Sequence, residues 1–251
     1  MQSDNKKYAG LNPDDFLLVS FPKTGSTFTR FVFANLISRL FLDAVDIDFY
    51  NLGDIMPELS KDLTKSYKYK GFPRIIKTHE SFNDYHKRAG NYIYVVRDPR
   101  DTMISYYHYL CARKSVMYQG TLSDFIRDNN YGIKVFNEHI KSWIDKKPFI
   151  FKYEDLMTDA INIFEDFFNF LKININRQII VNAVNASLPE KMRLNEIEFG
   201  RPNQDLNFRK GFVFVRDASI GQWRKGIFNN SDLMYFEKNL SHLFLALGYK
   251  F

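Results

Sequence analysis

Residues 16–27 read FLLVSFPKTGST, and this stretch decides the fold. The run FLLVSF is short, apolar and stopped by Pro22, which is typical of a strand buried on both faces of a sheet. From residue 26 to residue 41 the apolar residues recur every three or four positions, which predicts a helix. The sequence therefore predicts a strand, a glycine-containing turn and a helix in direct succession.

Further strands and helices alternate along the chain. The apolar runs predict strands at 74–77, 91–96 and 149–152, and helices at 101–110, at 162–171 and from a cap at Ser231 to Leu247. Such alternation indicates right-handed crossovers and a central parallel β-sheet flanked by helices. We expect a single α/β domain over residues 1–251, with residues 1–12 as a flexible N-terminus. Between 174 and 216 the pattern assigns no element.

The composition limits the classes of function. The net charge of +6 suits an anionic ligand, but also nucleic acid or a membrane surface. No five basic residues are consecutive, which argues against nucleic acid. No apolar stretch of about 18 residues and no signal-peptide core occur, so we expect a cytoplasmic protein without a membrane span. The single cysteine, Cys111, excludes an internal disulfide and a multi-cysteine metal site.

The turn at residues 21–27 (FPKTGST) has the features of an anion site. Backbone N–H groups at a helix start lack partners, and the helix dipole favours negative charge there. Lys23 adds a charge, Gly25 permits close approach, and Ser26 and Thr27 add hydroxyls. The lysine precedes the only glycine, so this is not a Walker A loop. The turn predicts phosphate binding, with an ordinary capped turn as the alternative.

A second segment, residues 75–80 (IIKTHE), places His79 where a strand ends. Ligands of open parallel sheets collect at the carboxyl ends of the strands. A histidine at this position is suited to remove a proton from an attacking hydroxyl. The alternative is an ordinary hydrogen-bonded histidine.

A third segment, residues 94–108, reads YVVRDPRDTMISYYH. Arg97 at the strand end suits bidentate phosphate binding, and Ser105 supplies a hydroxyl two helical turns later. Two alternatives stay open. Arg97 and Asp98 are also able to form a strand-end ion pair, and Asp98 is also readable as a Walker B carboxylate, which would favour a kinase.

Taken together, these segments resemble the cytosolic type of the sulfotransferase family that uses 3′-phosphoadenosine 5′-phosphosulfate (PAPS). Residues 23–28 (KTGSTF) resemble its 5′-phosphosulfate loop, PKSGTTW, and residues 76–79 its strand ending in Lys-Thr-His. Residues 94–108 resemble its 3′-phosphate segment, YxxRNPxDxxxSxYH, and residues 151–156 (FKYEDL) its Tyr-Glu-Asp strand end. The order and rough spacing agree from about residue 16 to residue 223.

The resemblance implies a P-loop-like, PAPS-binding sulfotransferase fold. It also implies transfer of a sulfuryl group from PAPS to a hydroxyl or amine of a small-molecule acceptor. The products would be a sulfate ester, for a hydroxyl acceptor, and adenosine 3′,5′-bisphosphate, and no metal is expected. The competing interpretations are a Mg-ATP-dependent small-molecule or nucleotide kinase and a non-enzymatic basic module that binds nucleic acid.

The resemblance also implies residue roles. His79 would be the general base, Lys23 would stabilise the leaving group, and Lys77 would contact the sulfuryl oxygens. If Glu80 served as base instead, loss of His79 would be mild. Phe28 stands where the family usually has tryptophan, and its smaller ring would stack on adenine. The implied cofactor-binding residues are Lys23, Thr24, Gly25, Ser26, Thr27, Phe28, Arg97, Ser105, Tyr153, Arg216 and Lys225.

One segment departs from the family. Where the family has Arg-Lys-Gly, this chain has Arg216, Asp217 and Ala218, which brings an anion and removes a glycine. Lys225, from a later Arg-Lys-Gly, is expected to compensate. The family's dimer motif is poorly matched near residues 225–234, so the oligomeric state is left open.

The acceptor is not identified by the sequence. Two variable stretches, residues 43–69 and 111–131, are expected to form its pocket, with packing of these loops onto the sheet as an equal alternative. The apolar candidates there are Phe49, Tyr50, Met56, Tyr67, Met117 and Tyr118.

Overall fold

The computed structural model describes residues 7–65 and 68–250. Its centre is a four-stranded sheet of order β2-β1-β3-β4, in which every neighbouring pair is parallel. The strands are β1 (Phe16–Ser20), β2 (Ile75–Thr78), β3 (Asn91–Val96) and β4 (Phe149–Lys152). Each predicted strand is confirmed to within one residue, and so is the predicted α/β class.

Ten α-helices and three short 3-10 helices surround the sheet in the described part of the chain. The α-helices are α2 (Ser26–Phe41), α3 (Leu52–Ile55), α4 (Pro99–Ala112), α5 (Leu122–Arg127), α6 (Ile133–Ile144), α7 (Tyr153–Phe170), α8 (Arg177–Ala186), α9 (Pro189–Phe199), α10 (Gln204–Asn207) and α11 (Asn230–Leu247). The 3-10 helices are η1 (Leu63–Lys65), η2 (Asp84–Arg88) and η3 (Gln222–Lys225).

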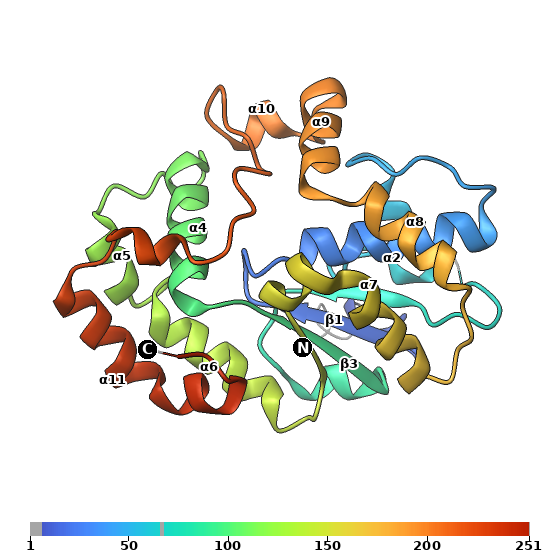
Figure 1. Ribbon diagram of the computed structural model, residues 1–251, viewed down its shortest axis with the longest axis horizontal. Helices are drawn as coiled ribbons and strands as arrows, with labels where there is room; N and C mark the ends of the chain where they lie inside the picture. The colour runs from blue at the N-terminus through green and yellow to red at the C-terminus, as the bar shows by residue number, and fades with distance from the viewer. Residues whose placement is uncertain (1–6, 66–67, 251) are drawn as a thin grey trace.

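Helices cover both faces of the sheet (Figure 1). In β1 the side chains alternate between two apolar cores. Leu17 and Val19 pack in the core shared with α4, α5, α6 and α11, whereas Phe16 and Leu18 pack in the core shared with α2, α7 and α8. Because both faces are buried, the strand reads as a continuous apolar run without alternation.

Two helix predictions are corrected, and one unassigned stretch is helical. The helix predicted at 162–171 begins at Tyr153, and the irregular backbone of Asp159 (φ −148°, ψ 44°) separates its two parts. The last helix is capped by Asn229 rather than Ser231, because the Asn229 side chain accepts a hydrogen bond from the Asp232 N–H. The stretch left unassigned contains α8, α9 and α10.

The N-terminal stretch, expected to be flexible over residues 1–12, is packed where it is described. Residues 1–6 lie outside the described residues. Tyr8 and Leu11 are buried in the core beside α6, and the Tyr8 hydroxyl donates to Glu80 over 2.5 Å. In the described residues, no helix combines the length and the apolar character needed to cross a bilayer.

The strand order creates one crevice. β1 lies between β2 and β3, so the connections that leave β1 and β3 run to opposite faces of the sheet. Ser20 and Val95 are register partners, which brings the carboxyl ends of the two strands level. Ligands of open α/β sheets bind at such a switch point. The turn after β1 and the Arg97 segment after β3 therefore face a common space.

Candidate functional site

The turn after β1 is shaped by a close approach of Gly25 to Tyr153. Gly25 has φ 107°, and a Cβ atom there would lie 2.4 Å from Cδ2 of the Tyr153 ring. No side chain caps the N-terminus of α2. The first N–H groups of this 16-residue helix therefore lack intrahelical partners and are suited to bind an anion.

Thr24 holds this turn in place. Its hydroxyl lies 2.9 Å from the carbonyl oxygen of Phe21 and 3.0 Å from that of Val95, and the side chain is fully buried. The hydroxyl thus ties the turn to β3. Thr24 does not line the cavity described below, although it was predicted to contact the cofactor.

Lys23 brings its ammonium against aromatic rings. Its Nζ lies 3.6 Å from the ring centroid of Phe214 and 5.1 Å from that of Tyr109. Burial, reinforced by the charges of Arg201 and Arg97, lowers the pKa of Lys23 to about 7. The side chain is therefore about half neutral near pH 7.

This pKa predicts proton uptake when an anion binds. Above pH 7 Lys23 is mostly neutral, and a phosphate beside it raises its pKa, so binding at pH 8 should take up nearly one proton. The affinity for adenosine 3′,5′-bisphosphate should accordingly fall as the pH rises from 7 to 9. Calorimetric titration in two buffers of different ionisation enthalpy measures the uptake. The Lys23→Met variant should show none, and equal heats for the wild type in both buffers would contradict the prediction.

Arg97 lies at the end of β3, 5% exposed, with one face over the Tyr153 ring. Its Nη2 donates to the Ser219 carbonyl over 2.8 Å and lies 3.9 Å from Oδ2 of Asp101. Its buried Nε has no partner among the described residues. The guanidinium therefore keeps a donor for a ligand. It does not pair with Asp98, which instead caps α4 and binds Arg100 at 2.7 Å.

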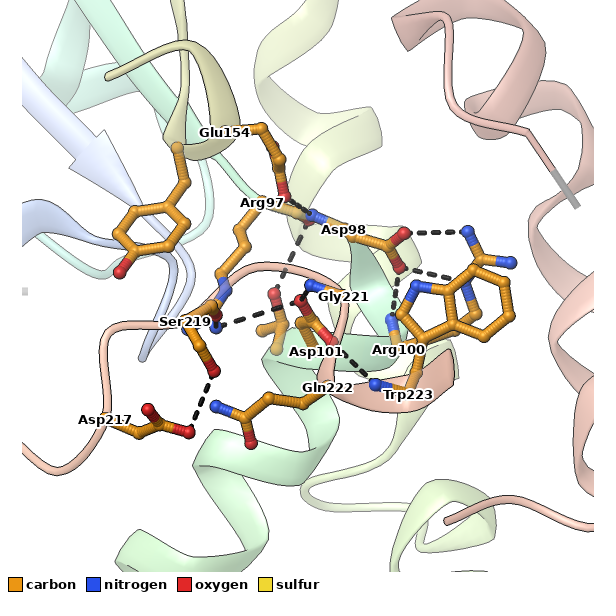
Figure 2. Close-up of polar contacts among 12 residues, drawn as sticks. Arg97, Asp98, Arg100, Asp101, Glu154, Asp217, Ser219, Gly221, Gln222 and Trp223 are labelled. Carbon is orange, nitrogen blue, oxygen red and sulfur yellow. Dashed lines mark hydrogen bonds and ion pairs between the residues drawn. The ribbon is translucent and has the colours of Figure 1, made fainter. Parts of the chain in front are cut away.

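Figure 2 shows how Asp101 fixes the segment that closes the site. Its carboxylate accepts from the N–H of Gly221 at 2.6 Å and from the N–H of Trp223 at 3.0 Å. Asp101 stands where the family's 3′-phosphate segment has its aspartate, and the motif alone does not indicate this bracing contact. Asp101 thus joins α4 to the segment that carries Arg216.

The departure at residues 216–218 is visible in the backbone. Ala218 has φ 55°, a conformation that favours glycine, and its carbonyl accepts from the Tyr153 hydroxyl over 2.8 Å. Arg216 donates to Gln222 at 2.8 Å, and Asp217 accepts from the hydroxyl of Ser219. Lys225 lies exposed in η3 and does not line the cavity, so the arrangement gives no support to its compensating role.

Ala218→Gly should stabilise the protein. The positive φ strains an alanine by about 1–2 kcal/mol, partly offset by the larger chain entropy of unfolded glycine. We expect a net gain of about 0.5–1 kcal/mol, or roughly 1–4 °C in Tm for a chain of this size. Thermal unfolding measures it. The matched variant Ala89→Gly, at φ −84°, should lower Tm, and an equal fall in both variants would contradict the account.

His79 is oriented by the end of β1. Its Nδ1 lies 2.6 Å from the Ser20 carbonyl, so Nδ1 carries the proton and Nε2 is left as the proton acceptor. Its own carbonyl accepts from the buried His139 at 3.1 Å. Burial, with the charge of Lys77, lowers the pKa of His79 to about 3. The imidazole is therefore neutral at neutral pH, as a general base requires.

Lys77 and Glu80, the other two candidate catalytic residues in this segment, are bound to side chains outside the cavity. Lys77 pairs with Glu58 at 3.5 Å, and Glu58 also pairs with Arg30 at 2.8 Å. Glu80 binds Lys7 and the Tyr8 hydroxyl, and its pKa is lowered to about 2 because the nearby His86 ring, Lys7 and the Tyr8 hydroxyl outweigh the effect of its burial. Neither side chain lines the cavity. The geometry favours His79 over Glu80 as the base.

These elements enclose a cavity of about 220 Å³ at the switch point. The predicted site residues that line it are Lys23, Gly25, Ser26, Thr27, Phe28, His79, Arg97, Ser105, Tyr153 and Arg216; Thr24, Lys77 and Lys225 do not. Lining residues that the sequence reasoning missed include Tyr106, Tyr109, Met192, Phe214 and Gln222. Segments far apart in the sequence thus meet in one basic cavity.

Of the apolar residues expected to form the acceptor pocket, none that the structure describes lines this cavity, although Arg113, from the expected stretch 111–131, does. Phe49 and Met56 are buried in the core, so for them the packing alternative holds. Tyr50 and Met117 are exposed, and Tyr118 is half-buried. Tyr67 lies outside the described residues.

Comparison with known proteins identifies the family of this chain. Residues 13–240 match the sulfotransferase domain family. The chain belongs to the sulfotransferase family. Human sulfotransferase 4A1 is 26% identical over 66% of this chain, and the match spans 63%, less than two thirds, of the human protein. Rat sulfotransferase 1E1 is 24% identical, with 84% of this chain and 77% of the rat protein covered.

The fold is shared with a solved structure. A retinol dehydratase in complex with androsterone and the inactive cofactor PAP has a TM-score of 0.71 at 20% identity, covering 96% of this chain and 83% of its own. This likeness supports the fold assignment for the sulfotransferase chain.

Proposed function

We propose that this protein is a PAPS-dependent sulfotransferase that transfers a sulfuryl group to a hydroxyl or amine of a small-molecule acceptor. One observation carries the proposal. The cavity at the carboxyl ends of β1 and β3 holds the Lys23 turn, His79, Arg97 and Ser105 together. The bound PAP of the structural neighbour, the bisphosphate product of PAPS, supports the choice of cofactor.

The lining residues fit such a nucleotide. The orphan Nε of Arg97, with Ser105 and Arg216 in the same lining, suits the 3′-phosphate that distinguishes PAPS from ATP. The start of α2, with Ser26 and Thr27, suits the 5′-phosphosulfate. Phe28 lines the cavity and offers its ring to the adenine, while most of the side chain is buried in the core.

PAPS supplies an activated sulfuryl group, and this chain's residues do the rest. Nε2 of His79 takes the proton of the acceptor hydroxyl while the hydroxyl oxygen forms its bond to sulfur. Lys23, in its ammonium form, stabilises the negative charge on the oxygen that separates from sulfur. No covalent enzyme intermediate is needed, since positioning and electrostatics supply the acceleration. A contact of Lys77 with the sulfuryl oxygens stays a prediction.

The kinase interpretation gains no support. Asp98, its candidate Mg²⁺ ligand, caps α4 and pairs with Arg100. The matched family and the relatives named above are sulfotransferases. A cytoplasmic location remains part of this proposal, on the basis of the sequence features alone.

The test is production of adenosine 3′,5′-bisphosphate from PAPS in the presence of a panel of phenols and amines. Wild-type protein should release it only when an acceptor is present. Arg97→Met should lose this activity, whereas Arg209→Met, an exposed arginine outside the cavity lining, should retain it. An Arg97→Met variant with wild-type turnover and KM for PAPS would contradict the proposal.

A further inference from the structure

α4 runs along one wall of the cavity, from one end of the cavity to the other. Ser105, Tyr106, Tyr109 and Arg113 all line the cavity, with a spacing that places them on one side of α4 and its cap. At 1.5 Å per residue, Arg113 lies roughly 12 Å along the axis from Ser105. Ser105 belongs to the end proposed for the nucleotide, so Arg113 marks the opposite end.

Arg113 lacks an anionic partner. Among residues 7–65 and 68–250, its side chain makes no hydrogen bond or ion pair, and its guanidinium carbon lies 6.0 Å from the Tyr109 ring centroid. It is exposed at the edge of the cavity. Asp217 is the acidic residue in the described lining, but it neighbours Arg216 and accepts from Ser219. The Arg113 end of the cavity is therefore positively charged and open to an anion.

Aromatic rings lie between the transfer centre and Arg113. The Tyr109 ring is 5.1 Å from Nζ of Lys23, and its centroid lies 6.2 Å from Phe214 and 6.3 Å from Tyr106. Arg113 follows Tyr109 by one helical turn, or about 6 Å. The Tyr109 ring centroid also lies 5.1 Å from Nζ of Lys23 and 6.0 Å from the guanidinium carbon of Arg113, so a phenol with a short acidic side chain para to its hydroxyl is able to bridge the two cations along this ring. Flat aromatic walls suit such a ring.

We propose that the acceptor is a phenol that bears a carboxylate or similar acidic group, which pairs with Arg113 while its hydroxyl faces His79 and Lys23. This inference rests on the proposed sulfotransferase function and adds the acceptor's chemical class. Arg113 acts in it as a specificity determinant.

The test is calorimetric titration of the protein saturated with adenosine 3′,5′-bisphosphate. Three probes share one ring and hydroxyl: 3-(4-hydroxyphenyl)propanoate, its neutral methyl ester, and the cation tyramine. Wild type should bind the acid roughly three- to tenfold more tightly than the ester, because the carboxylate forms a charge-assisted, partly exposed pair with Arg113. Wild type should bind tyramine most weakly of the three. Arg113→Gln should equalise acid and ester, and Arg113→Glu should bind tyramine in preference to the acid.

Lys134→Glu, an exposed lysine on α6 outside the cavity, changes the net charge equally and should leave the order of the probes unchanged. The inference is overturned if no probe binds, if the wild type binds the ester as tightly as the acid, or if Arg113→Glu keeps the wild-type order. If the bisphosphate itself fails to bind, both the proposed sulfotransferase function and the acceptor inference are contradicted. If the bisphosphate binds and only the probe order is wrong, the acceptor inference alone fails.

Discussion

His79→Ala is expected to lower the turnover of sulfuryl transfer by about 10²–10⁴, the range typical of a positioned general base. Affinity for adenosine 3′,5′-bisphosphate should be unchanged, because His79 acts on the acceptor side. The structure supplies the reason: the Ser20 carbonyl fixes the proton on Nδ1 and leaves Nε2 to accept another. Steady-state kinetics together with a bisphosphate titration separate the two effects.

Two matched variants sharpen this prediction. His242→Ala, on the exposed side of α11, should leave turnover unchanged. Glu80→Gln should affect turnover little, since Glu80 is bound to Lys7 and Tyr8 and does not line the cavity. A mild effect of His79→Ala combined with a severe effect of Glu80→Gln would assign the base to Glu80 and contradict the account.

Gly25→Ala is expected to disrupt both stability and nucleotide binding. The new Cβ would lie 2.4 Å from the Tyr153 ring, and φ 107° is strained for alanine. Overpacking costs about 1–3 kcal/mol and the backbone about 1–2 kcal/mol, so we expect a loss of roughly 2–5 kcal/mol. Movement of the Tyr153 ring would also disturb its bond to Ala218 and its contact with Arg97.

The matched control is Gly53→Ala, where an added Cβ meets no atom within 4 Å. This variant should unfold within a degree or so of the wild type, because surface changes are usually worth less than about 0.5 kcal/mol. Thermal unfolding with and without the bisphosphate measures both variants. Equal unfolding temperatures for the two variants would show that Tyr153 does not constrain the turn.

The sequence predicted the strands and helices that are determined by signals within their own residues. The strand at 16–20 and the helix at 26–41 follow from an apolar run, a breaking turn and a clear helical period. The start of α7 was missed because Tyr153 and the residues after it resembled a strand end, and the irregular Asp159 interrupts the period. α9 was missed because several apolar residues on it are exposed, so no buried stripe marks it.

The candidate site was predictable where the motif is contiguous. Most of the residues predicted in the turn after β1 and in the 94–108 segment line the cavity. The far side was predictable only in part. Arg113 lies in the stretch 111–131 that was expected to form the acceptor pocket, whereas Phe214 reaches the cavity only through the path of the chain after α10. Lys225 was assigned from a repeated tripeptide, yet it lies outside the lining.

A ligand-induced thermal shift tests most directly whether this cavity binds PAPS. At 100 times its dissociation constant, adenosine 3′,5′-bisphosphate should add about 2.7 kcal/mol, or roughly 5–10 °C. ATP–Mg²⁺ and adenosine 5′-monophosphate should add much less at the same concentration, and Arg97→Met should remove the difference. Stabilisation by ATP–Mg²⁺ equal to or above that by the bisphosphate, or an unchanged preference in Arg97→Met, would contradict the assignment of this cavity to PAPS.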